Sequence, residues 1–372
     1  MGNIFDYLDW RGDVPLSMDP FNEVDNLIFS MLVYVPFEGL SEESERVPLK
    51  EVQDAYFALH TEQEIAESKR YTAPAPLLMK KMTNSVRFGE TSVSWYRTAF
   101  DKESVVQFAA ITFHLPDGTS YVAYRGTDNT LVGWREDLEM AILKATEGQK
   151  MAKDYLNDVG EKIPGLLMVG GHSKGGNLSV YAASACEDDV RGRILTVWTN
   201  DGPGFREEFL QLEGYGRILQ RVVSILPEFS IFGRLLDNRC KHRIVESTGE
   251  GFSQHNGFTW SVRRNRFEEA EETQGSLRVE QMMDTWIDGM DDETRQNVAD
   301  TVFSLLESTG KATVEEIGSR KWRSILTILG SLKNLPKEKR HELLHQTGEL
   351  IRHGAQVLTE GDPEEKKEQE EK

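Results

Sequence analysis

The run Val169-Gly170-Gly171-His172-Ser173-Lys174-Gly175-Gly176-Asn177 decides the fold class of this chain. It sets Ser173 between glycines in the pattern Gly-x-Ser-x-Gly. Where a strand turns sharply into a helix, a serine must take a strained backbone conformation, and glycines on either side let the strand and the helix approach closely. The pattern is therefore typical of a nucleophile elbow with Ser173 as the nucleophile.

The residues around this run predict the strand and the helix that such a turn needs. Residues 166–169 read Leu-Leu-Met-Val, an apolar run typical of a strand buried on both faces of a parallel sheet. Residues 178–185 read Leu-Ser-Val-Tyr-Ala-Ala-Ser-Ala, a compact helix rich in small side chains. The alternative is a glycine-rich loop with an exposed serine, and the flanking pattern disfavours it.

Strand and helix patterns alternate along the middle of the chain. A helix pattern covers residues 149–162, and predicted strands cover residues 105–114, 119–125, 194–199, 221–226 and 243–247. Such alternation predicts a mostly parallel α/β sheet, in which the loops at the carboxyl ends of the strands converge on one site.

The two ends of the chain show helical patterns instead. Asp19-Pro20 reads as an N-cap and a first helical position, and apolar residues follow at helical spacing from Val24 to Leu32. From about Glu268 onward only helical signals continue. We therefore expect an α/β domain over residues 1–265 with an N-terminal helical segment at 1–100, a helical extension over 266–358, and a disordered acidic tail over 359–372.

Composition limits the possible partners and the cellular location. The 372 residues are 38% hydrophobic and 28% charged, which suits one large globular domain with an accessory region. A net charge of −19 argues against nucleic acid or an anionic membrane surface as the main partner. With two cysteines, no secretory signal pattern and no long apolar run, we expect a cytoplasmic protein without a transmembrane segment.

A serine hydroxyl is a weak nucleophile that needs a base with a pKa near the working pH, and histidine meets this condition best. In this topology the chain order is serine, acid, histidine, which excludes His60 and His114 among the eight histidines and disfavours His172. His255 fits best, because it lies beyond the last predicted strand in the glycine-bounded loop 251–257. We therefore expect His255 to be the base.

Two acidic residues are candidates for orienting that histidine. Asp201 directly follows the strand 194–199, and the motif Asn200-Asp201-Gly202-Pro203-Gly204 predicts a tight turn that would aim its carboxylate. Glu228 follows the next strand, after Pro227. Either could stabilise the charged imidazole, and we favour Asp201 slightly.

Acyl transfer also needs hydrogen-bond donors for the tetrahedral oxyanion. The backbone N–H of Lys174, next after the nucleophile, is the first candidate. Thr127 is the second, since Tyr124-Arg125-Gly126-Thr127-Asp128 ends the predicted hairpin at the right edge of the sheet. For Arg125 and Asp128 the alternative interpretation is an ion pair that only stabilises this loop.

These motifs carry a family resemblance. Tyr124-Arg125-Gly126-Thr127, Gly133-Trp134-Arg135-Glu136-Asp137-Leu138 and Gly171-His172-Ser173-Lys174-Gly175-Gly176 resemble class 3 lipases over residues 105–260. Further motifs are similar to an uncharacterised bacterial lipase-like family, a domain of unknown function: Phe5-Asp6-Tyr7-Leu8, Trp10-Arg11-Gly12-Asp13, Pro20-Phe21-Asn22, Asp201-Gly202-Pro203-Gly204-Phe205, Gln254-His255 and Phe258-Thr259-Trp260. The resemblance implies an α/β-hydrolase fold with Ser173 as nucleophile, His255 as base and Thr127 as oxyanion donor.

The chain departs from class 3 lipases at several positions. Lys174 stands where those lipases usually have an apolar residue, and Arg135-Glu136-Asp137 stands where they carry an apolar lid. Both departures argue against the binding of long acyl chains at an oil interface. The acid of class 3 lipases aligns better with Glu228, whereas the motif of the bacterial family favours Asp201.

A competing motif lies near the C-terminus. His341-Glu342-Leu343-Leu344-His345 matches the zinc-protease pattern of two histidines one helical turn apart with a glutamate as general base. Charged residues flank it, from Lys337 to Arg340, whereas such metal helices are buried and apolar. We therefore favour solvent-facing histidines on an amphipathic helix over a metallopeptidase site.

The sequence as a whole predicts a serine hydrolase of the lipase or esterase type. It would cleave a carboxylic ester of a small molecule or a lipid through an acyl-enzyme, without a cofactor or a metal. The alternative is a hydrolase-like scaffold that has lost turnover and serves as an interaction module, with the acidic C-terminal helices as its docking surface.

Overall fold

The computed structural model describes residues 2–277 apart from 38, 41–44, 69, 129 and 141–142, together with Glu293, Gln296 and Asp300. The chain divides into two compact units, one of residues 1–127 and 144–272, the other of residues 128–143 and 273–372. In the second unit the described residues include helix α6 (Leu131–Glu139), where Arg135 forms ion pairs with Glu139 and Asp300. The predicted helices beyond residue 300, and the pattern His341-Glu342-His345, lie outside the described residues.

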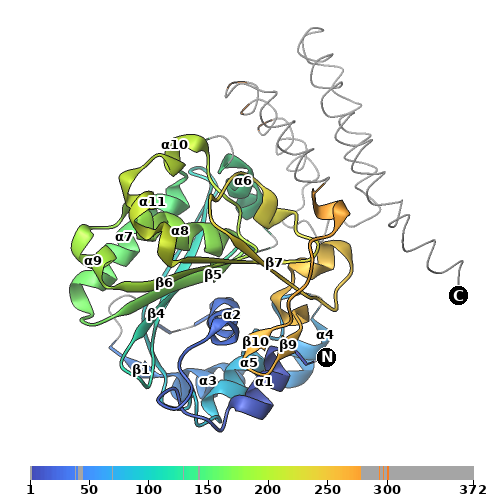
Figure 1. Ribbon diagram of the computed structural model, residues 1–372. Helices are drawn as coiled ribbons and strands as arrows, with labels where there is room; N and C mark the ends of the chain where they lie inside the picture. The colour runs from blue at the N-terminus through green and yellow to red at the C-terminus, as the bar shows by residue number, and fades with distance from the viewer. Residues whose placement is uncertain are drawn as a thin grey trace, which may run out of the picture. The chain divides into compact units, whose positions relative to one another are not determined.

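An eight-stranded sheet forms the centre of the first unit (Figure 1). Its strands follow chain order: β1 (Val47–Pro48), β2 (Ser92–Asp101), β3 (Val106–His114), β4 (Ser120–Tyr124), β5 (Leu167–His172), β6 (Ile194–Asn200), β7 (Val222–Pro227) and β8 (His242–Val245). The pairs from β1 to β4 are antiparallel, and those from β4 to β8 are parallel. The predicted α/β class with a mostly parallel central sheet is therefore confirmed.

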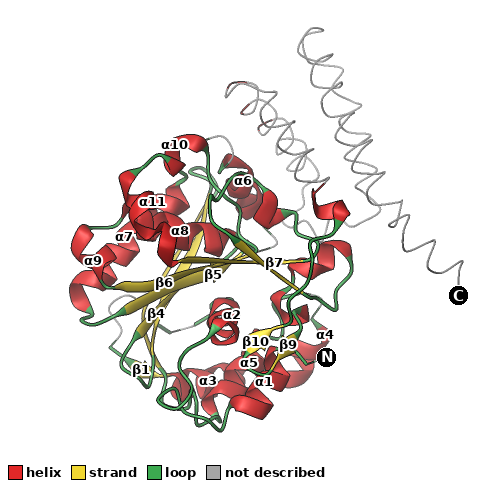
Figure 2. Cartoon of the chain, in the orientation of Figure 1, coloured by secondary structure: helices red, strands yellow, loops and turns green. Residues whose placement is uncertain are grey.

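Helices cover both faces of this sheet (Figure 2). One face carries α7 (Glu147–Lys162), α8 (Lys174–Ala185), α9 (Asp188–Gly192), α10 (Glu207–Leu210) and α11 (Glu213–Ile218). The other carries α1 (Ile4–Arg11), α2 (Glu23–Leu32), α3 (Leu49–Leu59), α4 (Glu62–Glu67), α5 (Ala75–Thr83) and the small antiparallel pair β9 (Val262–Arg263) and β10 (Arg266–Phe267). Short 3₁₀ turns complete the unit: η1 (Leu219–Arg221), η2 (Phe232–Arg234), η3 (Gly251–His255) and η4 (Gly257–Thr259).

The N-terminal segment 1–100 was predicted to be helical, and it also contributes β1 and β2 to the sheet. The ten residues of β2 do not alternate cleanly between apolar and polar. The strand contains a bulge, because its register shifts between Ser94 and Arg97 and Trp95 has a φ of 58°. Such a bulge breaks the period of two on which strand prediction depends. The sequence signal for this strand was therefore lost at the bulge.

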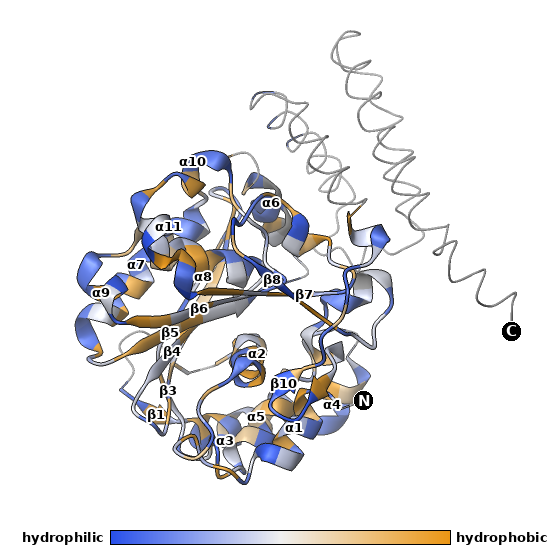
Figure 3. Ribbon diagram, in the orientation of Figure 1, coloured by the Kyte–Doolittle hydropathy of each residue, from blue (hydrophilic) through white to orange (hydrophobic). Residues whose placement is uncertain are grey.

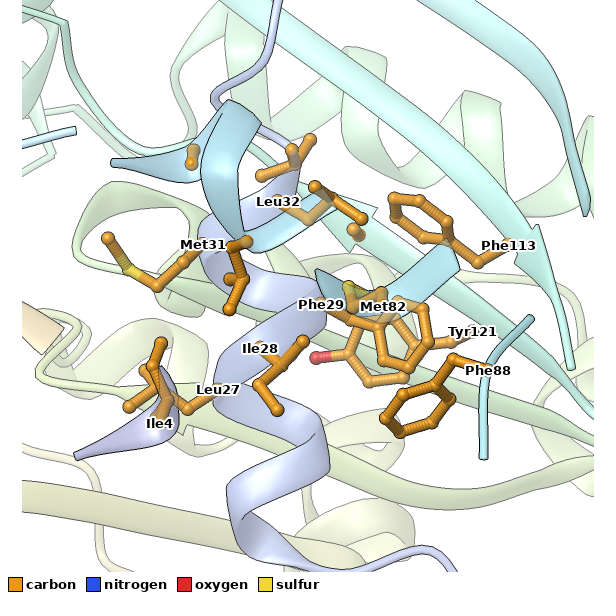
Figure 4. Close-up of a cluster of buried hydrophobic side chains, with 14 of the residues drawn as sticks. Ile4, Leu27, Ile28, Phe29, Met31, Leu32, Met82, Phe88, Phe113 and Tyr121 are labelled. Atoms are coloured by element: carbon orange, nitrogen blue, oxygen red, sulfur yellow. The ribbon is translucent and has the colours of Figure 1, made fainter. Parts of the chain in front are cut away.

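Helix α2 builds the core on its face of the sheet, where it packs against β4, β5 and β6. Its ten residues are all buried, and the Phe29 ring lies 5.0–5.4 Å from the rings of Phe88, Phe113 and Tyr121 (Figure 4). Apolar residues also follow the inner strands β5 and β6, while α9 is mostly polar (Figure 3). An amphipathic arrangement of this kind buries the apolar side chains between the helices and the sheet.

The N-cap of α2 differs from the prediction. Asn22, and not Asp19, caps the helix: its Oδ1 accepts hydrogen bonds from the N–H groups of Val24 and Asp25 at 2.9 and 3.2 Å. Asp19 instead accepts a hydrogen bond from Arg11 Nε at 2.8 Å. The helix begins three positions after Pro20, since Asn22 satisfies the first donors of the helix.

A buried ion pair anchors this helical layer. The Arg87 guanidinium and the Asp25 carboxylate are both fully buried and form a two-point contact, with Nε donating to Oδ1 at 2.9 Å and Nη2 donating to Oδ2. Tyr7 Oη donates to Asp25 Oδ1 at 2.8 Å, and Arg87 also donates to the carbonyl oxygens of Val14 and Asp19 at 3.2 and 2.9 Å. The pair therefore ties α1, α2 and the segment after α5 together.

The described part of the chain holds no helix with the length and apolar character that a bilayer span requires.

We predict that Asp25→Ala lowers the free energy of unfolding by about 3–5 kcal/mol, because it leaves the Arg87 charge buried without its partner. Urea unfolding followed by circular dichroism measures the change. Asp54→Ala is the control, since the exposed Lys50–Asp54 pair is worth about 0–1 kcal/mol at most. Equal losses in the two variants would contradict the role of the buried pair.

Candidate active site

Ser173 lies at the turn between β5 and α8. Its backbone has φ 58° and ψ −132°, a conformation that residues with a side chain rarely adopt. Its N–H donates to the carbonyl oxygen of Asn200 in the neighbouring strand β6 at 2.9 Å. The strand before it is buried throughout and runs from Leu167 to His172, so it starts one residue later than predicted and continues to the serine.

The glycines around Ser173 are required by close backbone contacts. A Cβ on Gly171 would lie 2.3 Å from the carbonyl carbon of Gly175, and a Cβ on Gly175 would lie 2.1 Å from the carbonyl oxygen of Tyr124. At distances this short a side chain at either position would force the neighbouring backbone to shift. The pattern Gly-x-Ser-x-Gly is thus explained by the packing of β5 and α8 on the end of β4.

His255 and Asp201 form a hydrogen-bonded pair. The distance from His255 Nδ1 to Asp201 Oδ2 is 2.6 Å, although the two residues are 54 positions apart in the chain. The Asp201 carboxylate is buried, and the His255 ring is mostly buried against Phe232, whose ring centroid lies 4.2 Å away. A carboxylate on Nδ1 holds the imidazole in one orientation and leaves Nε2 as its remaining nitrogen for proton transfer.

Asp201 is held in place from several sides. It directly follows β6 with a φ of 50°, and its Oδ1 accepts hydrogen bonds from Ser230 Oγ and from the N–H of Gly233, the latter at 3.1 Å. Burial favours the protonated acid, but His255 and the hydrogen bond from Ser230 outweigh burial and lower the pKa of Asp201 below its usual value. The carboxylate is therefore ionised at neutral pH.

The loop after Asp201 is fixed by Asn177 of α8. Asn177 Nδ2 donates to the carbonyl oxygens of Pro203 and Gly204 at 3.1 and 2.9 Å. Its Oδ1 accepts from Gln149 Nε2 of α7 at 2.8 Å. The helix that follows Ser173 thus also sets the path of the loop that carries the acid.

Glu228 follows β7 but does not lie on His255 Nδ1, which Asp201 occupies. Its carboxylate receives a hydrogen bond from the backbone of Ser247, and burial raises its pKa. Its own N–H donates to the carbonyl oxygen of Val245 at 3.1 Å. Of the two predicted acids, the structure brings Asp201 to the histidine.

The loop that carries His255 rests on the residue next to Ser173. His172 Nε2 lies 2.6 Å from the His255 carbonyl oxygen, and the centroids of the two imidazole rings are 4.6 Å apart. Sequence reasoning missed this contact, as it missed Ser230 and Phe232. No local pattern marks residues whose partners lie so far away in the chain.

Of the two candidate oxyanion residues, Lys174 directly follows the serine and Thr127 follows a glycine that contacts the Ser173 turn. A Cβ on Gly126 would lie 3.1 Å from Ser173 Cβ and 2.5 Å from the His172 carbonyl oxygen, so the loop that carries Thr127 packs directly on the Ser173 turn. Thr127 is buried, and its carbonyl oxygen accepts a hydrogen bond from Tyr71 Oη at 3.3 Å. Its backbone therefore has a fixed position beside the serine.

Lys174 begins α8, and its side chain is bound to β3. Its Nζ donates to the carbonyl oxygen and to Oε1 of Gln107 in β3, at 2.7 and 2.9 Å. The buried ammonium therefore bonds to β3, whereas the backbone N–H of Lys174 remains next to Ser173. Among the described residues, no three His, Cys, Asp or Glu side chains gather as metal ligands would.

The central sheet is mostly parallel, a serine stands at the strand-to-helix turn after β5, and an Asp–His pair lies beyond later strands. The chain therefore has the α/β-hydrolase fold that was predicted. The chain belongs to the Mbeg1-like family, whose model matches residues 82–304.

Solved structures similar to this chain include lipases. M37 lipase is 19% identical, with 48% of this chain and 70% of that chain covered and a TM-score of 0.34. Rhizomucor miehei lipase in its native propeptide complex is 12% identical, with coverage of 57% and 76% and a TM-score of 0.33. A deletion mutant of the same lipase, also in its propeptide complex, is 12% identical, with coverage of 64% and 91% and a TM-score of 0.36. None of the curated proteins matches this chain by sequence.

We predict that Gly175→Ala destabilises the protein by about 1–3 kcal/mol, because the added methyl group would press on the backbone of Tyr124. The thermal unfolding midpoint measures the loss. Gly216→Ala in α11 is the matched control, since open space surrounds that position and alanine favours a helix by about 1 kcal/mol. A Gly175→Ala protein as stable as the control would contradict the close approach of α8 and β4.

Proposed function

We propose that this chain is a serine hydrolase of the lipase or esterase type that cleaves a carboxylic ester. The observation that carries the proposal is the 2.6 Å contact between Asp201 and His255, on a loop held against the strained turn at Ser173. A buried carboxylate on one imidazole nitrogen, with the other nitrogen left for proton transfer, is the arrangement that activates a serine hydroxyl. Under this proposal the turn is a nucleophile elbow.

The reaction runs in two steps. In the first, Ser173 Oγ forms a bond to the ester carbonyl carbon, while His255 Nε2 takes the hydroxyl proton and then gives it to the departing alcohol. The backbone N–H groups of Thr127 and Lys174 donate to the oxyanion of the tetrahedral intermediate. In the second, water attacks the acyl-enzyme by the same route and releases the acid, and Asp201 stabilises the imidazolium ion in both steps.

The substrate we propose is an ester of a small molecule or a lipid, and the reaction needs no cofactor. A cytoplasmic location suits the two cysteines, Cys186 and Cys240, which are both free thiols. The charged side chains after Thr127 argue against the binding of long acyl chains at an oil interface.

We predict that a fluorophosphonate probe labels the folded protein and that Ser173→Ala abolishes the labelling, because only an activated serine reacts. Gel fluorescence measures the labelling. Ser184→Ala is the control, since Ser184 lies further along α8 and bonds to the Val180 carbonyl oxygen of its own helix. A folded wild-type protein that takes up no probe would favour a scaffold without turnover.

We predict that Asp201→Asn lowers kcat by about 10³–10⁴-fold, because an amide no longer stabilises the imidazolium ion or the correct tautomer. Glu228→Gln is expected to stay within about threefold of the wild type, since Glu228 bonds to the Ser247 backbone. Hydrolysis of a chain-length series of p-nitrophenyl esters measures both variants. The reverse ranking would assign the acid to Glu228.

A further inference from the structure

His172, the residue directly before Ser173, has partners at both of its ring nitrogens. Its Nε2 lies 2.6 Å from the carbonyl oxygen of His255, and its Nδ1 lies 3.4 Å from Tyr34 Oη. A carbonyl oxygen can only accept a hydrogen bond, so Nε2 carries the proton and donates it. Nδ1 is then the acceptor for the Tyr34 hydroxyl.

The surroundings of His172 keep this ring neutral. The ring is fully buried, and burial together with the neighbouring His255 lowers the pKa of His172 to about 3. A neutral ring with both nitrogens already engaged is poorly suited to be the base for Ser173. It is suited to be a fixed hydrogen-bond donor.

The group that His172 holds is the backbone of the proposed base. His255 ends the 3₁₀ turn η3, and the preceding residue, Gln254, has partners of its own: its Oε1 accepts from the Phe229 N–H at 2.9 Å and its carbonyl oxygen from Trp260 Nε1 at 2.8 Å. The hydrogen bond from His172 joins this turn to the strand leading into Ser173.

We propose that His172 is a positioning residue for the reaction: its Nε2–H holds the His255 backbone at a fixed distance from Ser173. The nucleophile and the base come from segments 82 positions apart, and a side chain adjacent to the nucleophile acts with the contacts of Asp201 and Gln254 to fix where the base loop rests. The catalytic part of this inference rests on the proposed function, whereas the hydrogen bond itself does not.

Loss of the His172 donor is expected to lower the reaction rate through a shift of the loop that carries His255. Without Nε2–H the His255 carbonyl oxygen would lose this partner in a partly buried position, which favours a shift of the loop. A displacement of about 1 Å at a reacting group can cost about 100-fold in rate. The rate of the chemical step should therefore fall, while substrate affinity changes little.

The experiment compares His172→Gln with His172→Leu in the full chain. The glutamine amide can reach about as far as Nε2 and keeps a donor, whereas leucine has none. We expect His172→Leu to lower kcat by about 10–100-fold with KM within about threefold, and His172→Gln to recover most of kcat. Should the leucine variant not fold, His172→Asn replaces it, because its shorter amide cannot reach the carbonyl oxygen.

A substrate-free measurement separates this inference from the proposed function. The proton between His255 Nδ1 and Asp201 Oδ2 should give a downfield proton resonance, which we expect to be lost in His172→Leu and kept in His172→Gln. His114→Leu is the matched control, since His114 is also a buried imidazole with two hydrogen bonds, to Ser94 at 2.8 Å and Ser120 at 3.1 Å. Ser120 begins β4, at the opposite end of that strand from the Gly126 loop, so kcat and the resonance should survive there.

Two results would overturn the inference: a wild-type kcat and resonance in folded His172→Leu, or a glutamine variant as impaired as the leucine one. A wild-type protein that hydrolyses no ester, but whose resonance responds as expected, would remove the proposed function and support the positioning of His255.

Discussion

The left-handed backbone bend at Ser173 is the constraint on which the rest of the structure depends. Such a conformation costs a residue with a side chain about 1–3 kcal/mol, and the conformation persists only where several surrounding contacts hold it. Here the surroundings are largely backbone: the Ser173 N–H donates to Asn200, and Gly171 and Gly175 touch neighbouring main chain. The strands β4, β5 and β6 and the helix α8 therefore meet at one rigid point, next to which the proposed base and oxyanion donors lie.

The N-terminal layer supports the same point from the opposite face of the sheet. Asn200 Nδ2 donates to the Gly171 carbonyl oxygen at 3.0 Å, and Asn26 Nδ2 of α2 donates to Asn200 Oδ1 at 2.8 Å. Tyr121 Oη donates to Asn26 Oδ1 at 2.7 Å. A buried polar network of this kind is rigid when its members are satisfied, so α2 contributes to the site as well as to the core.

The choice of acid shows where sequence reasoning reaches its limit. Asp201 and Glu228 both follow parallel strands, and both patterns were compatible with a partner for His255. The hydrogen bonds from Ser230 and Gly233 hold Asp201 toward the histidine, while the backbone of Ser247 engages Glu228. These partners lie 19–32 positions away in the chain, so no local pattern could have ranked the two acids.

The sequence alone determined the α/β class, most strand positions and the place of Ser173 between a buried strand and a helix. These properties depend on residues that are neighbours in the chain, through the period of apolar side chains and the need for glycine in a close approach. Only the tertiary structure decided that Asn22 caps α2, that β2 joins the sheet through a bulge, and that His172 reaches His255 across 83 positions. Those outcomes depend on which groups come within hydrogen-bonding distance when the sheet assembles. The separation of two residues along the chain does not tell how far apart they lie in the folded protein.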